Sequence, residues 1–76
     1  MYYDVVASIY DGLSRKDSRL ICGGFKTEEK ASQYIDDNDI WATDYSWLCE
    51  CGEFVSIDIE VHHEDGTLES IIETNN

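Results

Sequence analysis

Three cysteines and two histidines are the side chains of this sequence with the most specific chemistry. Three thiolates and one imidazole could bind zinc, and the chain offers Cys22, Cys49, Cys51, His62 and His63. The spacing is unsuitable, because one residue separates Cys49 from Cys51 where zinc knuckles usually have about two to four. The two histidines are neighbours in an extended segment and point to opposite faces. We therefore expect buried structural thiols, no metal site and no cofactor.

A run of short acidic residues at 36–39 raises the question of calcium. An EF-hand loop needs oxygen ligands at its first, third and fifth positions and glycine at its sixth. Starting the loop at Asp36 puts Ile40 at the fifth position, and starting it at Asp37 puts Trp41 there. Neither start supplies the glycine. The run is better interpreted as the solvated end of a helix.

The sequence contains none of the motifs that mark common catalytic sites. There is no nucleophile elbow, phosphate-binding glycine loop, dinucleotide fingerprint or HExxH motif. Carboxylates are plentiful, but apolar neighbours single out no pair of them, as a general acid would require. We expect a protein without enzymatic activity.

Charge is divided unevenly along the 76 residues. The formal net charge is −12, and all basic residues lie in the first half of the chain: Arg15, Lys16, Arg19, Lys26 and Lys30. Residues 1–30 are neutral overall, so the whole excess falls in residues 31–76. Such a balance argues against direct binding to nucleic acid or to anionic membranes. The aromatic content of 12% argues against disorder.

The first half of the chain predicts a hairpin followed by a helix. Residues 2–10 alternate as a strand, residues 11–17 form a polar connection, and residues 19–25 form a second strand. Gly23-Gly24 indicates either a bulge or the end of that strand. Thr27 is the expected N-cap of a helix that ends in the acidic run. Residues 40–51 fit either a helix or a strand, and we favour a second helix.

The last segment predicts a second hairpin. Residues 55–62 alternate, Asp65-Gly66 is a two-residue turn signal, and residues 68–74 return as the partner strand. The expected fold is a single α+β domain: two antiparallel β-hairpins forming a four-stranded sheet, with one or two helices packed on one face (β-β-α-(α)-β-β). Strand order does not follow from these patterns.

The register of the second hairpin places charge on one face. About that turn, Glu64 faces Thr67, His62 faces Glu69, Glu60 faces Ile71 and Asp58 faces Glu73. The outer face then collects a set of carboxylates that we predict to bind a partner: Asp58, Glu60, Glu64, Glu69 and Glu73. Opposed acids destabilise a strand pair, so stability alone does not account for them.

Two functions remain open. The first is an acidic protein-interaction module, an inhibitor or DNA-mimic-like binder of a basic or nucleic-acid-binding protein. In size and charge the chain is similar to the small acidic proteins of phages and mobile elements, DNA mimics and anti-CRISPR proteins among them. The alternative is a self-associating structural or accessory protein with no charge-based partner, and a third interpretation of the charge is solubility alone. The odd number of cysteines and the N-terminus without a signal-peptide pattern favour a cytoplasmic location. We expect the protein to be a monomer or a weak homodimer.

Overall fold

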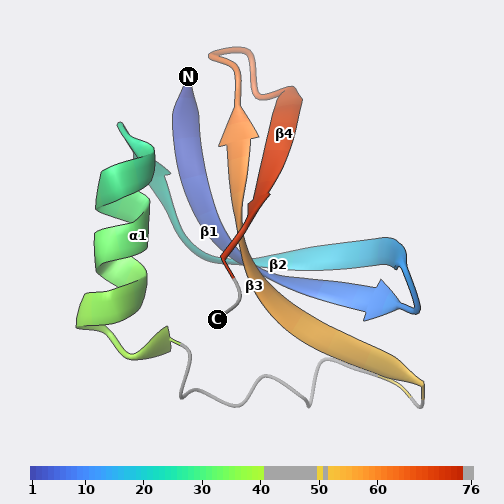
Figure 1. The fold of residues 1–76 in the computed structure, drawn as a ribbon. Helices are drawn as coiled ribbons and strands as arrows, with labels where there is room; N and C mark the ends of the chain where they lie inside the picture. The colour runs from blue at the N-terminus through green and yellow to red at the C-terminus, as the bar shows by residue number, and fades with distance from the viewer. Residues whose placement is uncertain (41–49, 51, 75–76) are drawn as a thin grey trace.

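A computed structural model of the protein describes residues 1–40, 50 and 52–74. Its elements follow one another as β1 (Tyr2–Asp11), β2 (Ser14–Phe25), α1 (Glu28–Asp37), β3 (Glu53–His62) and β4 (Leu68–Glu73). The strands form one antiparallel sheet in the order β2-β1-β3-β4. Figure 1 shows α1 beside one face of this twisted sheet. The predicted α+β fold, with a helix between two hairpins, is confirmed.

The first hairpin has a much tighter turn than the sequence predicted. Asp11 pairs directly with Ser14, so the connection is Gly12 and Leu13 alone, and residues 14–18 belong to β2. Gly12 has a φ of 63°, as the first position of a type II′ turn requires. The prediction of a polar loop over 11–17 was wrong because β2 is an edge strand. Its polar residues resemble a loop when they are judged by composition alone.

The bulge predicted at Gly23-Gly24 is confirmed. The register shifts between Tyr3, opposite Phe25, and Val5, opposite Cys22. The N–H of Gly24 donates to Oδ1 of Asp4 at 2.9 Å, and a Cβ at Gly23 would come within 2.4 Å of the same oxygen. Glycine is therefore required where β2 passes the carboxylate of Asp4.

Helix α1 begins as predicted. The Thr27 hydroxyl accepts a hydrogen bond from the N–H of Lys30 at 3.2 Å, as an N-cap does. The helix ends at Asp37, inside the acidic run. The predicted second helix over 40–51 falls, apart from Ile40 and Glu50, outside the residues that the structure describes.

The second hairpin keeps most of the predicted register. Asp58 pairs with Glu73, Glu60 with Ile71 and Val61 with Ser70, as expected. A register shift beyond Val61 then pairs His62 with Leu68, so the prediction that His62 faces Glu69 was wrong.

The shift arises in the turn. His63 and Thr67 close a three-residue loop: the N–H of His63 donates to the carbonyl of Thr67, and the N–H of Gly66 donates to the carbonyl of His63, both at 2.9 Å. Gly66 has a φ of 91°, the left-handed conformation that a three-residue hairpin loop with a bulge requires. Asp65 and Gly66 do lie in the turn, but they share it with Glu64.

The hydrophobic core lies between α1 and the sheet. It consists of buried residues from the helix, from the two central strands and from the segment after the helix: Ala31, Ile35, Val5, Ala7, Ile57, Ile59 and Ile40. Phe25 and Tyr34 extend it at one edge, with ring centroids 5.4 Å apart. Among the described residues, no helix has the length and apolar character needed to cross a membrane.

Candidate functional site

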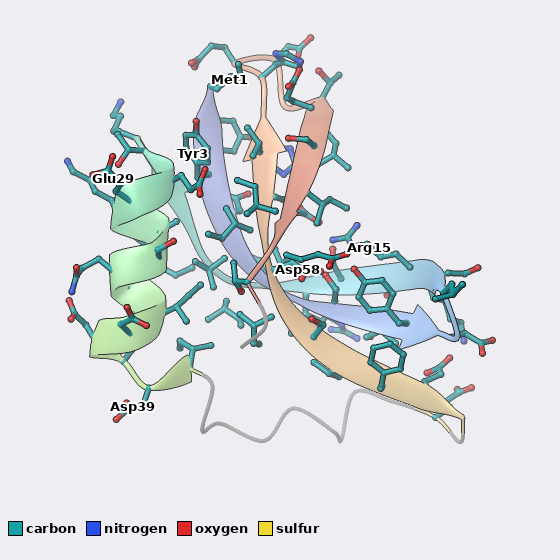
Figure 2. The ribbon with its side chains drawn as sticks, in the orientation of Figure 1. Met1, Tyr3, Arg15, Glu29, Asp39 and Asp58 are labelled. Atoms are coloured by element: carbon teal, nitrogen blue, oxygen red, sulfur yellow. The ribbon has the colours of Figure 1, made fainter. Side chains whose placement is uncertain are left out.

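The face of the sheet turned away from α1, called the outer face below, holds the polar side chains of the central strands. Side chains alternate between the two faces along a strand. On β1 and β3, the residues next to core residues such as Val5 and Ile59 therefore point to the outer face. Figure 2 labels Arg15 and Asp58, which lie on it, and Asp39 at the far end of α1. The pairs Asp4–Glu60 and Val6–Asp58 are direct neighbours across β1 and β3.

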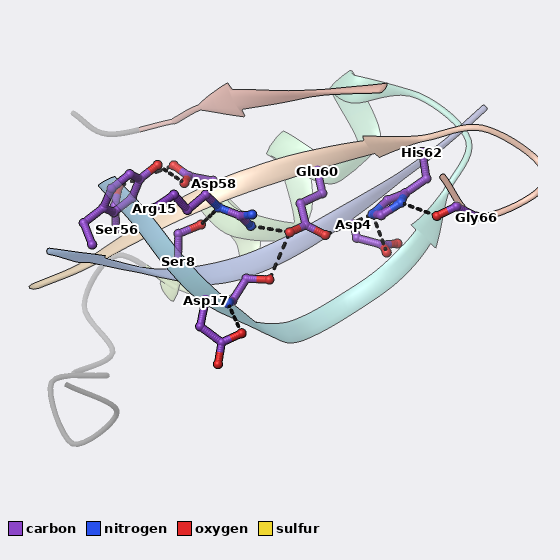
Figure 3. Close-up of polar contacts among 11 residues, drawn as sticks. Asp4, Ser8, Arg15, Asp17, Ser56, Asp58, Glu60, His62 and Gly66 are labelled. Atoms are coloured by element: carbon purple, nitrogen blue, oxygen red, sulfur yellow. Dashed lines mark hydrogen bonds and ion pairs between the residues drawn. The ribbon is translucent and has the colours of Figure 1, made fainter. Parts of the chain in front are cut away.

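Glu60 is the centre of a network on the outer face (Figure 3). Its Oε2 accepts from the guanidinium of Arg15 and, at 3.0 Å, from the hydroxyl of Ser18. Arg15 also donates from Nε to Oγ of Ser8 at 3.1 Å. The side chains of Glu60 and Arg15 are only 12% and 21% exposed. Burial raises the pKa of Glu60, but hydrogen bonds from Arg15, His62 and Ser18 lower it by more.

His62 completes this network. Its Nε2 lies 2.9 Å from Oε1 of Glu60 and 3.6 Å from Oδ2 of Asp4, and its Nδ1 lies 3.1 Å from the carbonyl oxygen of Gly66. Carboxylates and carbonyls only accept, so the charged ring, with two N–H donors, satisfies both contacts. Burial lowers the pKa of His62, but the bonds to Glu60 and Gly66 and the charge of Asp4 raise it by more. The ring of Tyr2 stacks on the imidazole at 5.1 Å.

Asp4, Glu60 and His62 are also the residues that could hold a metal ion. One ligand atom from each lies within 4.8 Å of the others, and the residue types suit a divalent cation. The hydrogen bond between Nε2 and Glu60 already accounts for this approach without an ion, because a ring proton occupies the position that a metal would take. Sequence reasoning missed this cluster, since Asp4 and His62 come from opposite ends of the chain.

We expect that removing divalent metal leaves the protein's stability unchanged. A structural metal contributes its binding free energy to folding, whereas the hydrogen-bonded cluster of Asp4, Glu60 and His62 needs none. The melting temperature of purified protein should be the same with and without EDTA, and metal analysis should find no stoichiometric zinc. A melting temperature that falls on chelation would show that this cluster, or the cysteines, holds a metal. Cys22 is a free, half-buried thiol, and Cys49 and Cys51 lie outside the described residues.

Asp58 is fully buried on the outer face. It accepts from the hydroxyl of Tyr10 at 2.9 Å and from that of Ser56 at 3.4 Å. Burial, and next the hydrogen bond to Asp58, raise the pKa of Tyr10. The ring of Tyr10 stacks on Phe54 at 5.3 Å. This arrangement gives Asp58 a structural role, as an acceptor inside the sheet.

The structure separates the five predicted partner-binding residues into two groups. Asp58 and Glu60 are enclosed and satisfied by internal donors, so a partner does not reach them directly. Glu64, Glu69 and Glu73 are exposed. Glu64 pairs with the N-terminal amine at 2.7 Å, and Glu69 lies 3.2 Å from Nε2 of His63. Within the described part of the chain, the side chain of Glu73 has no hydrogen bond or ion pair.

Helix α1 adds exposed carboxylates that the sequence-based prediction did not assign to a partner. Glu28 and Glu29 lie in its first turn, and Asp36, Asp37 and Asp39 lie at its end, where no basic residue accompanies them. The side-chain carboxylates of Glu28 and Asp36 form no hydrogen bond or ion pair with any described residue. Their spacing of eight positions, about two helical turns, places them on one stripe beside the core positions Ala31 and Ile35 and could have revealed this second acidic stripe.

The fold and its polar network define a small α+β domain with an enclosed ionic cluster on one sheet face and uncompensated acids elsewhere. The sequence matches no protein-family model, and comparison with curated proteins and with solved structures finds no match. Function must therefore be argued from this chain's own surface.

Proposed function

We propose that this protein is a non-enzymatic interaction module that binds a basic protein through an acidic surface beside strand β4. This surface, called the β4 surface below, consists of exposed carboxylates on the two sides of the edge strand β4: Glu28 and Asp36 on α1, and Glu69 and Glu73 on the outer face. The observation that carries the proposal is the contrast between these acids and the enclosed ones. Glu60 is neutralised by Arg15 and His62, whereas Glu28, Asp36 and Glu73 have no ion pair within the described residues.

The end of α1 supports the same proposal. The C-terminal end of a helix carries a partial negative charge, so acidic residues there lower the stability of the helix. Asp36, Asp37 and Asp39 nevertheless occupy this end, and Asp39 adopts a positive φ of 49°. A basic partner would offset a repulsion that the isolated protein leaves uncompensated.

The charge pattern indicates the class of partner. Proteins that bind nucleic acid present clustered Lys and Arg to phosphates, and an acidic surface of this kind competes for such clusters. Long-range attraction also raises the association rate. The proposed role is therefore inhibition of a basic or nucleic-acid-binding protein by occupation of its binding surface, without any chemical step.

Self-association is the second candidate, and the edge strands favour it. Strands β2 and β4 each pair with one neighbour only, so each leaves a row of backbone groups open in the described part of the chain. Leu20 on β2 is 66% exposed. Edge pairing is insensitive to salt, whereas binding through the β4 surface weakens as salt rises.

Capture from a lysate of the encoding organism tests the proposal. The triple variant Asp36→Asn, Glu69→Gln, Glu73→Gln removes three charges from the β4 surface and nearly keeps side-chain shape. We expect the parent to retain a protein of high isoelectric point at low salt. The variant should lose at least about tenfold in affinity for that protein, because electrostatic steering and direct contact with the basic partner are both reduced. The purified partner's association rate should fall with ionic strength.

The matched control is Asp11→Asn, Asp17→Asn, Glu50→Gln, which removes the same charge from exposed positions away from β4. It should bind the partner within about twofold of the parent. If the control and the β4-surface variant bind equally well, the surface charge serves solubility. A parent that sediments as a salt-insensitive dimer would favour self-association instead.

A further inference from the structure

A groove runs between α1 and the end of β4. Its lining comes from one side of the helix and from the last residues of the hairpin: Glu28, Ser32, Ile35, Asp36, Ile72, Glu73 and Thr74. Ile35 is 1% exposed and Ile72 is half-buried, so the floor is apolar. Glu73 pairs with Asp58 and is directed to the outer face, so it borders the groove through its backbone.

The helical wall of the groove is acidic at both ends. Glu28 and Asp36 are eight positions apart, which corresponds to about 12 Å along a helix axis. Ser32 lies between them on the same stripe. Neither carboxylate has an ion pair with a described residue, and no basic residue lines the groove. The groove therefore presents negative charge, an apolar floor, and negative charge again, in that order.

This order specifies the chemistry of an occupant. One cationic head group cannot reach two carboxylates about 12 Å apart, so two basic side chains are needed. An apolar side chain between them would cover the half-buried Ile72. In an extended chain, residues i, i+2 and i+4 share a face, and i and i+4 lie about 13 to 14 Å apart. Long basic side chains adapt to the remaining difference through their flexible stems.

We propose that the groove binds an extended segment of the partner with the pattern basic–x–apolar–x–basic. The proposal rests on the acidic interaction function argued above and names the contact that the partner makes. The outer basic side chains pair with Glu28 and Asp36, and the central side chain packs on Ile72, above the buried Ile35. The charges attract basic proteins in general, whereas the apolar floor and the spacing select among them.

Synthetic peptides test this pattern directly. The probe is a capped peptide containing Arg-Thr-Val-Thr-Arg, and two controls have the same charge: one with serine in place of the central valine, and one with the two arginines adjacent. Binding is followed by NMR titration of the ¹⁵N-labelled protein at low salt. We expect the patterned peptide to bind about fivefold more tightly than either control, since apolar burial and spacing both contribute. The shifted amide signals should centre on Ser32, Ile35, Asp36 and Ile72.

Two protein variants locate the contact. Glu28→Gln with Asp36→Asn should weaken the patterned peptide about tenfold and remove its preference over the adjacent-arginine control. Ser32→Arg places a long cationic side chain on the stripe and should abolish binding. The control variant Asp11→Asn with Asp17→Asn should have no effect. Circular dichroism of each variant confirms that the protein is folded.

The outcomes separate this inference from the general function. If all three peptides bind equally and the groove variants change nothing, the groove proposal is wrong while charge-based binding stands. If no peptide binds at low salt, yet the lysate partner binds through Glu69 and Glu73, the groove proposal is again wrong. Loss of both peptide and partner binding in every assay would overturn the interaction function itself.

Discussion

Replacing Arg15 with methionine should lower the free energy of unfolding by about 2 kcal/mol, a value typical of lost hydrogen bonds to a partly buried charge. Methionine keeps most of the apolar stem but leaves Glu60 on a mostly covered face without its guanidinium partner. Ser8 also loses the hydrogen bond from Nε. For a domain of this size the melting temperature should fall by about 10 °C.

Lys16 provides the matched control for Arg15. It is the next residue in the chain, it carries the same charge, and it pairs with Glu53, but its side chain is 54% exposed. Lys16→Met should therefore cause a clearly smaller loss than Arg15→Met, because solvent screens an exposed pair. Urea unfolding of both variants measures the difference. Equal losses would show that net charge, and not the enclosed contact to Glu60, determines the effect.

Stability should depend on pH through Glu60 and His62, with a maximum between their titrations. The folded pKa of His62 is raised, so its contribution is fully present below its ordinary value of 6.5 and is lost as pH rises through the raised value. The folded pKa of Glu60 is lowered, so its contribution is present above 4.5 and is lost as pH falls through the lowered value. The groups facing His62 are Asp4 and Tyr2 on β1, Glu60 on β3 and the Gly66 carbonyl in the loop.

Replacing His62 with glutamine should reduce stability at pH 6 by about 1 kcal/mol, a figure discounted for the solvent that reaches the ring. The loss should become smaller as pH rises through the raised pKa of His62, because the charged ring that makes both contacts is then deprotonated. His63→Gln is the control, because His63 is exposed and 46% of its side chain is accessible beside Glu69. Unfolding curves from pH 4.5 to 8.5 measure both variants. The assignment fails if His62→Gln and His63→Gln show the same pH dependence.

Much of the fold could be predicted because local patterns and tertiary packing agree. The alternation in β1 and β3, the Thr27 cap and the glycines in the turns each have a local physical cause. The errors in the prediction also have physical causes. Residues 14–18 are polar because they lie on an edge strand and supply Arg15 and Ser18 to the outer face, a demand that arises only once β2 is paired. The shift at His62 follows from a loop one residue longer than the turn signal indicated.

The site was harder to predict because it depends on strand order. The sequence indicated which residues of β3 share a face, and Asp58 and Glu60 do share one. It did not indicate that β1 lies beside β3, which brings Asp4 and Tyr10 against them, or that Arg15 reaches across from β2. Carboxylates that looked available in the hairpin alone are covered by side chains from the first hairpin. Of the five carboxylates predicted to bind a partner, Glu64, Glu69 and Glu73 stay exposed.

The central position of β1 also has a consequence for how the chain folds. Its first neighbour, β2, is reached through a two-residue turn, so this pairing forms early and locally. Its second neighbour, β3, pairs with it from Asp11–Glu53 to Tyr2–His62, which are contacts of high sequence separation. Closing such loops is the slow step in the folding of antiparallel proteins. During folding, β1 therefore keeps one edge unpaired until β3 reaches it, and its charged residues, Asp4 and Asp11, oppose pairing of that edge with another copy in the meantime.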